Sequence, residues 1–166
     1  MAMGQELRVE LREITPEMVH EICALSDTLP ERQRAFVASN EVSLTQAQES
    51  TTAWVRAIYA DGEPAGLIMI ADNVEKQTYF LWRLMVAKSF QGRGIGRRAV
   101  ELLIDYVRTR PGAQELLVSY VPAEDGPSGF YSRLGFVPTG QVEGKEHVAS
   151  LDLATPTEGS HEWRGL

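Results

Sequence analysis

The sequence predicts a single α/β domain built on a mixed, mostly antiparallel sheet of six or seven strands with about four helices. The chain has 166 residues, of which 43% are hydrophobic, and this suits one domain with a sizeable core. Short runs typical of strands recur along the chain, separated by turn-forming residues. A strongly amphipathic helix follows a glycine-rich turn near the middle. These observations together predict helices packed on a sheet.

Strand and helix signals divide the N-terminal half of the chain. Apolar and charged residues alternate over 7–12, which is the pattern of a half-buried strand. Thr15 and Pro16 have the residue types of an N-cap and a first helical position, which predicts a helix to about residue 25. The further predicted elements are helical fragments near 31–37 and 44–49, a strand hairpin over 54–70 that turns at Asp61 and Gly62, a turn that begins at Asp72 and Asn73, and a buried central strand over 77–86.

The clearest helix begins at Ile95, where apolar residues recur with helical spacing and charged residues occupy the other side. Pro111 and Gly112 end it. The elements predicted after it are a strand over 116–121, a short helix over 128–134 and a final strand pair at 136–137 and 147–153. Residues 154–166 are rich in Thr, Pro, Gly, Ser and Glu, so we expect a mobile tail after a domain that spans 1–153.

Charge and cysteine content limit the classes of function. Lys and Arg total 16 against 23 Asp and Glu, which gives a formal net charge of −7. An acidic balance argues against a nucleic-acid partner and is compatible with a cationic substrate. Cys23 is the only cysteine, so no intrachain disulfide can form. The first residues lack the pattern of a signal peptide and no apolar run approaches a membrane span, so we expect a soluble cytoplasmic protein without a membrane partner.

The turn at 91–96, with sequence QGRGIG, has the composition of a phosphate site. The first N–H groups of a helix lack intrahelical partners, and glycines let a phosphate approach the backbone closely. Positive side chains gather here, namely Lys88, Arg93, Arg97 and Arg98. The dinucleotide fingerprint is not met, because it would need glycine at Arg97, and no P-loop motif occurs. The turn therefore suits a pyrophosphate, with a purely structural strand-to-helix connection as the alternative.

Gln91, Gly94 and Gly96 fit the Q/R-x-x-G-x-G/A signature of the GNAT superfamily of N-acetyltransferases, which this chain resembles. Residues 82–90 are similar to the fourth strand and following loop of that family, and FYSRLGF at 130–136 is similar to its FY-x-x-L-G-F segment. Within the superfamily, residues 77–140 look most like the bacterial spermine/spermidine (diamine) acetyltransferases. That finer resemblance lies in FLWR at 80–83 and SYVP at 119–122.

The resemblance implies acetyl-CoA as co-substrate, held in a GNAT-like fold whose fourth and fifth strands splay apart. The pantetheine arm would then pair with the main chain of Leu84, Met85 and Val86, and an N–H near Leu84 or Met85 would polarise the thioester carbonyl. Tyr131 matches the family tyrosine that protonates the leaving CoA thiolate. The implied pyrophosphate contacts are Gln91, Gly92, Arg93, Gly94, Ile95, Gly96 and Arg97.

Two positions depart from the family pattern. Glu124 stands where relatives often carry an asparagine that hydrogen-bonds the cofactor, and a carboxylate cannot donate as an amide does. Trp82 stands where some polyamine acetyltransferases have a glutamate, so the general base is open. The candidates for this base are Glu75, Glu124, Asp125, Glu143 or a chain of water molecules. The histidines are scattered, so no metal site is expected.

The sequence therefore predicts an N-acetyltransferase in which a primary amine attacks acetyl-CoA directly. A polyamine is the first expected acceptor, with Glu124 and Asp125 as candidate substrate-binding residues. Antibiotic, amino-acid and peptide amines remain open, as does a homodimer. The alternative functions are a catalytically weak CoA-binding sensor or assembly domain and, less favoured, a nucleotide-binding module.

Overall fold

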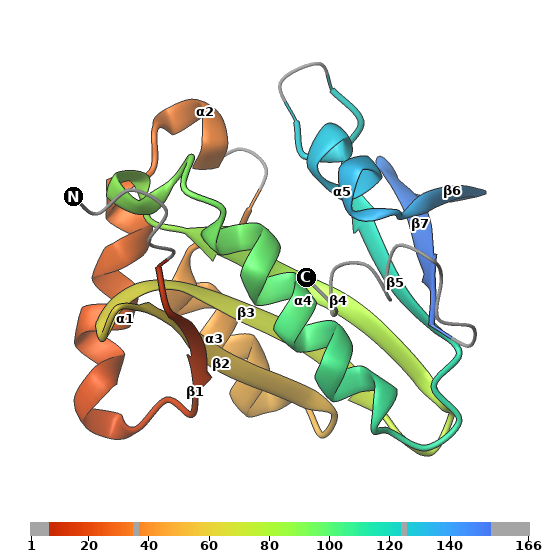
Figure 1. Ribbon diagram of the computed structural model, residues 1–166, viewed down its shortest axis with the longest axis horizontal. Coiled ribbons are helices and arrows are strands. Elements are labelled where there is room, and N and C mark those ends of the chain that lie inside the picture. Colours follow the sequence, from red (N-terminus) through yellow and green to blue (C-terminus); the bar gives the residue numbers. More distant parts are fainter. Residues whose placement is uncertain (1–6, 35–36, 124–125, 154–166) are drawn as a thin grey trace.

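The computed structural model describes residues 7–34, 37–123 and 126–153 and confirms the predicted α/β fold. Seven strands form one sheet in the order β1-β2-β3-β4-β5-β7-β6 (Figure 1). All neighbouring strands are antiparallel except β4 and β5, which are parallel. The strands are β1 (Val9–Arg12), β2 (Ala53–Ala60), β3 (Glu63–Asn73), β4 (Thr78–Val86), β5 (Glu115–Tyr120), β6 (Val137–Glu143) and β7 (Glu146–Asp152).

Helices cover both faces of the sheet (Figure 1). The α-helices within the described ranges are α1 (Val19–Leu25), α2 (Glu31–Arg34), α3 (Asn40–Glu49), α4 (Ile95–Arg108) and α5 (Ser128–Leu134). Short 3-10 turns are η1 (Pro16–Met18), η2 (Ser26–Thr28) and η3 (Lys88–Phe90). The expected tail over 154–166 lies outside the described residues.

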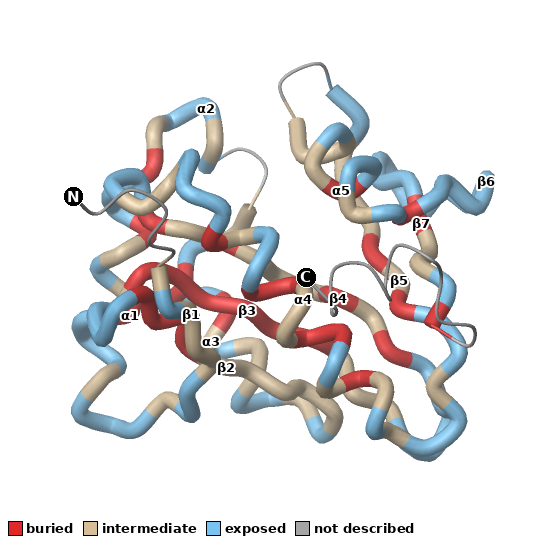
Figure 2. Tube along the Cα trace, viewed as in Figure 1, coloured by how far each residue is buried: buried red, intermediate tan, exposed pale blue. Residues whose placement is uncertain are grey.

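The alternation of side chains along the strands produces two hydrophobic cores. Ile68 belongs to the cluster under α4, which also contains Leu103. Leu67 and Met69, its neighbours in β3, belong to the opposite cluster with Ile22 of α1. Figure 2 shows the buried residues along the central strands, whereas β6 at the sheet edge is exposed along its whole length. The central strands are therefore fixed from both sides.

The predicted turn at Asp72 and Asn73 is wrong, because both residues continue β3. The Asp72 carboxylate accepts a hydrogen bond of 2.6 Å from the Tyr106 hydroxyl and one of 3.1 Å from Nε of Arg110. These long-range bonds to α4 and its end give a charged residue a partner inside the sheet. The turn follows over 74–77.

β4 and β5 separate soon after they meet, as the family resemblance implied. Their parallel register contains only Phe80 with Leu117 and Leu81 with Val118. Beyond these pairs β4 continues along β3, while β5 continues along β7. The sheet therefore has an opening between β4 and β5 at the carboxyl ends of both strands.

Candidate active site

A cleft of about 840 Å³ occupies the opening between β4 and β5. Its walls come from α2, β4, the glycine-rich turn, the start of α4, β5 and α5. Tyr120 lies with the core under α4, whereas Met85, also in the wall, belongs to the core under α1 and α3. The cleft therefore reaches both faces of the sheet.

The main chain of β4 points polar groups into this cleft. The Ala87 N–H donates to the Ala65 carbonyl at 2.7 Å and continues the β3–β4 ladder. Hydrogen-bonded and non-bonded residues alternate along an antiparallel strand. Leu84 and Val86 therefore direct their N–H and C=O groups away from β3 and into the gap, whereas Met85 directs its own toward β3. This edge of β4 can pair with an extended ligand.

The glycine-rich turn joins the end of β4 to α4. Gly92 and Gly94 have φ of +76° and +79°, a conformation that glycine adopts without strain. A Cβ at either position would meet no atom within 4 Å, so the space beside the turn is open. Gly94 caps α4 without a side-chain hydrogen bond, which leaves the N–H groups of Ile95, Gly96 and Arg97 without intrahelical acceptors. The turn has the geometry of an anion site.

Arginines surround this turn, but a carboxylate balances part of their charge. Arg97 and Arg98 each lie 3.3 Å from Glu101, and their side chains are 53% and 48% exposed. The guanidinium carbon of Arg93 lies 5.5 Å from the centre of the Phe90 ring. Exposed charges act mainly through a field that salt screens. The specific contacts to an anion would therefore come from the backbone N–H groups.

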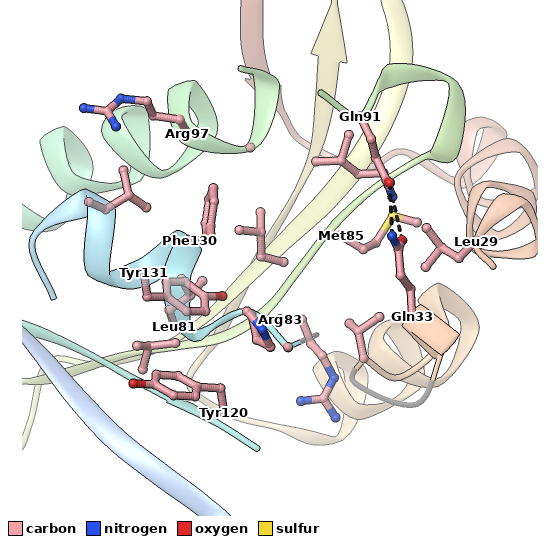
Figure 3. A pocket seen from close by; sticks show the side chains of 18 of the residues that line it. Leu29, Gln33, Leu81, Arg83, Met85, Gln91, Arg97, Tyr120, Phe130 and Tyr131 are labelled. Carbon is pink, nitrogen blue, oxygen red and sulfur yellow. Dashed lines mark hydrogen bonds between the residues drawn. The ribbon is translucent and has the colours of Figure 1, made fainter. Parts of the chain in front are cut away.

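The carboxamide of Gln91 holds the turn in place. Its Nε2 donates to the Val86 carbonyl at 2.9 Å and to Oε1 of Gln33 at 2.8 Å. Figure 3 shows the Gln91 and Gln33 side chains meeting at one wall of the cleft. Because its polar atoms already have protein partners, Gln91 contributes to the site by fixing the turn against β4 and α2.

Tyr131 lies on α5 at the opposite wall, with its hydroxyl directed into the cleft (Figure 3). The residue is only 8% exposed, and its ring stacks on Tyr120 with the ring centres 5.8 Å apart. Phe130 and Phe136 meet the same ring edge-on. Burial raises the pKa of the Tyr131 phenol above its ordinary value, so the group stays neutral and able to donate a proton near pH 7. Within the described ranges the hydroxyl has no hydrogen-bond partner.

The model of the acetyltransferase (GNAT) family matches residues 17–136, which is most of the chain. The chain belongs to the GNAT family. A curated relative, the 5-NmdU N-acetyltransferase of Pseudomonas phage PaMx11, is 26% identical over 111 residues, covering 67% of this chain and 76% of the relative. Together these matches identify a GNAT N-acetyltransferase, for which acetyl-CoA is the acetyl donor.

Solved GNAT structures share the fold at low sequence identity. Mycobacterium smegmatis RimJ in complex with CoA-disulfide matches with a TM-score of 0.75 and 15% identity, covering 96% of this chain and 91% of that one. A spermidine N-acetyltransferase SpeG chimera from Vibrio cholerae and hSSAT matches with a TM-score of 0.65 and 16% identity, covering 88% and 96%. Identities this low support the fold and leave the acceptor open.

Most of the predicted GNAT site residues line one cleft. These are Leu84, Met85, Val86, Gln91, Gly92, Gly94, Ile95, Gly96, Arg97 and Tyr131. Arg93 is not among the lining residues, and Glu124 and Asp125 lie outside the described residues. Glu75 lies in the turn between β3 and β4, and Glu143 ends β6. Neither carboxylate lines the cleft, which gives no support to these two candidates for the general base.

A bulge in β4 brings an unpredicted arginine to the cleft of this GNAT domain. Met69 pairs with Arg83 while Ile70 pairs with Leu81, so Trp82 is an extra residue in β4. Trp82 and Arg83 consequently point to the same face, toward α1 and α3. Nη2 of Arg83 donates to Oε1 of Gln46 on α3 at 3.0 Å. Strand alternation predicted from sequence cannot locate such a bulge.

Ser119 and Glu146 also line the cleft, although neither was predicted from the sequence as a site residue. The Ser119 hydroxyl donates to Oε1 of Glu146 at 2.6 Å. Only the pairing of β5 with β7 brings these residues together, since they are 27 positions apart. In the described part of the chain no cluster of three or more potential metal ligands occurs, and no helix is long and apolar enough to span a membrane.

Proposed function

We propose that this GNAT enzyme transfers the acetyl group of acetyl-CoA to a primary amine that attacks the thioester directly. One observation carries the proposal: the glycine-rich turn, the open edge of β4 and the Tyr131 hydroxyl line the same cleft. The pantetheine arm of acetyl-CoA, which connects a pyrophosphate to a reactive thioester, matches that order of features. The acceptor would then meet the thioester beside Tyr131.

The proposed roles follow from the directions of the groups. The N–H groups of Ile95, Gly96 and Arg97 would bind the pyrophosphate. The main-chain groups of Leu84 and Val86 face the gap, so Leu84 is favoured over Met85 as the N–H donor to the thioester carbonyl. These contacts would align the thioester and stabilise the negative charge that develops on its oxygen.

Tyr131 would donate its proton to the sulfur as the carbon–sulfur bond breaks. The phenol is neutral near pH 7 even at its ordinary pKa, and burial raises that pKa further. Its hydroxyl has no competing partner in the described ranges. The aromatic contacts with Tyr120, Phe130 and Phe136 fix the ring, so the donor is held in place before the substrates bind.

The proposed acceptor is a small cationic amine, with a polyamine as the first candidate. Support comes from the net charge of −7 and from the resemblance to diamine acetyltransferases at 80–83 and 119–122. A spermidine N-acetyltransferase chimera is among the structures with the same fold, but so is a ribosomal-protein-S18-alanine N-acetyltransferase. The acceptor must therefore be decided by experiment.

Amine-dependent release of the CoA thiol tests the proposed function. The full-length chain with acetyl-CoA should release CoA on addition of spermidine, benzylamine or an alanine-terminated peptide, with one class clearly preferred. A protein that binds acetyl-CoA, as shown by a raised melting temperature, yet releases no CoA with any amine would instead match the sensor or assembly domain.

A further inference from the structure

The carboxylate of Glu146 lines the cleft, but it has no role in the proposed binding of acetyl-CoA or in proton donation by Tyr131. We propose that Glu146 binds the ammonium group of the acceptor and accepts its proton, and that Ser119 is a positioning residue that orients this carboxylate. The inference rests on the proposed function, because it requires an amine acceptor. It supplies the general base that the sequence left open.

Ser119 and Glu146 face the side of the sheet opposite Tyr131. Along β5, Val118 packs in the core under α4 and Tyr120 stacks on Tyr131. Alternation therefore directs Ser119 to the other face, and its hydrogen bond brings the Glu146 carboxylate to that face as well. The acceptor would thus approach the thioester from the face of the sheet opposite α4, the helix that follows the glycine-rich turn.

The Glu146 carboxylate has capacity left for a ligand. Its Oε1 accepts from Ser119, and none of the described residues forms an ion pair with it within 4 Å. Arg83 lies on β4 across the cleft, but its Nη1 and Nη2 donate to the Trp82 carbonyl and to Gln46. Burial lowers the pKa of Arg83 while the charge of Glu146 raises it, so the two groups interact without pairing. Oε2 of Glu146 remains open for an ammonium group.

Other charged and titratable groups around Glu146 shape its field. Arg83 and Arg133 face the same cleft, and Glu143 is opposite Glu146 in the β6–β7 register. Lys145 and His147 are its neighbours in sequence. Cations and a second carboxylate therefore surround Glu146, and the pH dependence is best read from the acceptor, whose protonation state is known in solution.

The reaction balances with both residues in these roles. The acceptor R–NH₃⁺ gives one proton to Glu146, and the nitrogen lone pair forms the bond to the thioester carbon. The carbon–sulfur bond breaks as Tyr131 protonates the sulfur. The second proton lost from nitrogen restores the phenol through solvent, and Glu146 returns its proton to water. The net products are the acetamide, CoA thiol and one released proton.

The first test is Glu146→Gln in the full-length chain, assayed by CoA release with the better of spermidine and benzylamine. At pH 7 such amines, with pKa values near 10, are almost wholly protonated, so kcat/KM should fall roughly 10²- to 10⁴-fold. Near pH 9.5 much of the amine is already the free base, and the loss relative to wild type should shrink by about tenfold or more. A loss that is the same at both pH values, or no loss, overturns the inference.

Glu115→Gln is the matched control. Glu115 accepts a hydrogen bond of 2.5 Å from Ser150 in the same pair of strands, but at the end of β5 away from the cleft. Glu115→Gln removes the same charge and replaces the carboxylate in the same kind of serine contact without touching the site. We expect Glu115→Gln to keep wild-type kcat/KM, and an equal loss in both variants would show a structural role for these pairs.

The positioning role of Ser119 is tested by rescue. Ser119→Ala should lower kcat/KM for the amine by roughly tenfold while the KM for acetyl-CoA stays unchanged, and Ser119→Thr, which keeps a hydroxyl, should restore most of it. Equal activity in Ser119→Ala and wild type contradicts this role. A wild-type chain inactive on every amine contradicts the proposed function and the inference together, whereas an active wild type with an equally active Glu146→Gln contradicts the inference alone.

Discussion

Gln33 on α2 and Gln91 before α4 exchange two hydrogen bonds, of 2.8 Å and 3.2 Å, although they are 58 positions apart. The pair holds the glycine-rich turn against the short helix α2 at one wall of the cleft (Figure 3). Gln91 alone makes the additional bond to the Val86 carbonyl. The fixed position of the glycine-rich turn therefore depends more on Gln91 than on Gln33.

This arrangement predicts a graded effect on acetyl-CoA binding. Gln91→Ala should weaken binding by about 1–2 kcal/mol and Gln33→Ala by about half as much, because each of these partly buried hydrogen bonds contributes on the order of 1 kcal/mol. Calorimetric titration with acetyl-CoA measures both, and Gln48→Ala on the exposed side of α3 serves as control. A larger loss of acetyl-CoA affinity for Gln33→Ala than for Gln91→Ala would contradict the predicted ranking of the two variants.

Gly94→Val should remove most of the rise in melting temperature that acetyl-CoA causes. The valine side chain would enter the open space beside the turn, and φ of +79° would strain it by about 1–3 kcal/mol. Gly140→Val in β6 is the matched control, since Gly140 also has positive φ, +89°, and open space around its Cβ position. Both variants should have a lower melting temperature than wild type, but only Gly94→Val should lose the rise in melting temperature on addition of acetyl-CoA. An unchanged response in a folded Gly94→Val protein would show that the turn is structural only.

Tyr131→Phe should lower turnover roughly 10²-fold or more and leave acetyl-CoA binding largely intact. The substitution keeps the aromatic contacts with Tyr120 and Phe136 and deletes only the proton donor. Tyr59→Phe, in the core under α1 and α3, controls for the loss of a hydroxyl outside the cleft. Full activity of Tyr131→Phe in single-turnover experiments would rule out the proposed role.

The hypothesis for Glu124 and Asp125 rests on sequence alone, since these residues lie outside the described ranges. If their charges hold a polyamine, Glu124→Gln and Asp125→Asn should reduce kcat/KM more for spermidine than for benzylamine. The difference should shrink with added salt, because exposed charges are screened over about 10 Å at 0.1 M. Equal losses for the two amines would exclude this binding role.

Tyr106 predicts a loss of stability at alkaline pH. Burial, with the hydrogen bond to Asp72, raises its pKa to about 12. Because the folded-state pKa lies above the unfolded value near 10, the contribution of Tyr106 to stability is complete below pH 10 and is lost as the pH rises toward 12. Chemical denaturation between pH 8 and 11 should show a shallower decline for Tyr106→Phe than for wild type. An identical slope would show that other groups cause the alkaline loss.

Local patterns in the sequence were sufficient for one half of the cleft. The turn containing Gly94 and the segment containing Tyr131 are contiguous motifs that can be found without knowing which strands are neighbours, and both line the cleft. The role predicted for Tyr131 came from the family resemblance. The splayed opening followed from the family resemblance and is confirmed by the two-pair register of β4 with β5. Site residues that belong to a short contiguous motif can therefore be predicted from the sequence.

The other half of the cleft depends on long-range register. Ser119 and Glu146 meet only because β5 pairs with β7, and Arg83 faces them only because Trp82 is an extra residue in β4. The strand status of Asp72 likewise required its partners Tyr106 and Arg110. Alternation and turn propensity act over a few residues, so they cannot report bonds formed between distant strands.

The opening between β4 and β5 connects the two faces of the sheet within the part of the chain that the structure describes. If acetyl-CoA and the acceptor bind at this opening from opposite faces of the sheet, neither blocks the path of the other. CoA and the acetylated product can then each dissociate from the face at which its precursor bound. Initial-rate kinetics should then show a ternary complex without a compulsory order of addition. A bisubstrate analogue, in which coenzyme and acceptor are joined covalently, would have to pass one of its ends through the opening between β4 and β5. It should therefore associate slowly and, once bound, dissociate slowly as well.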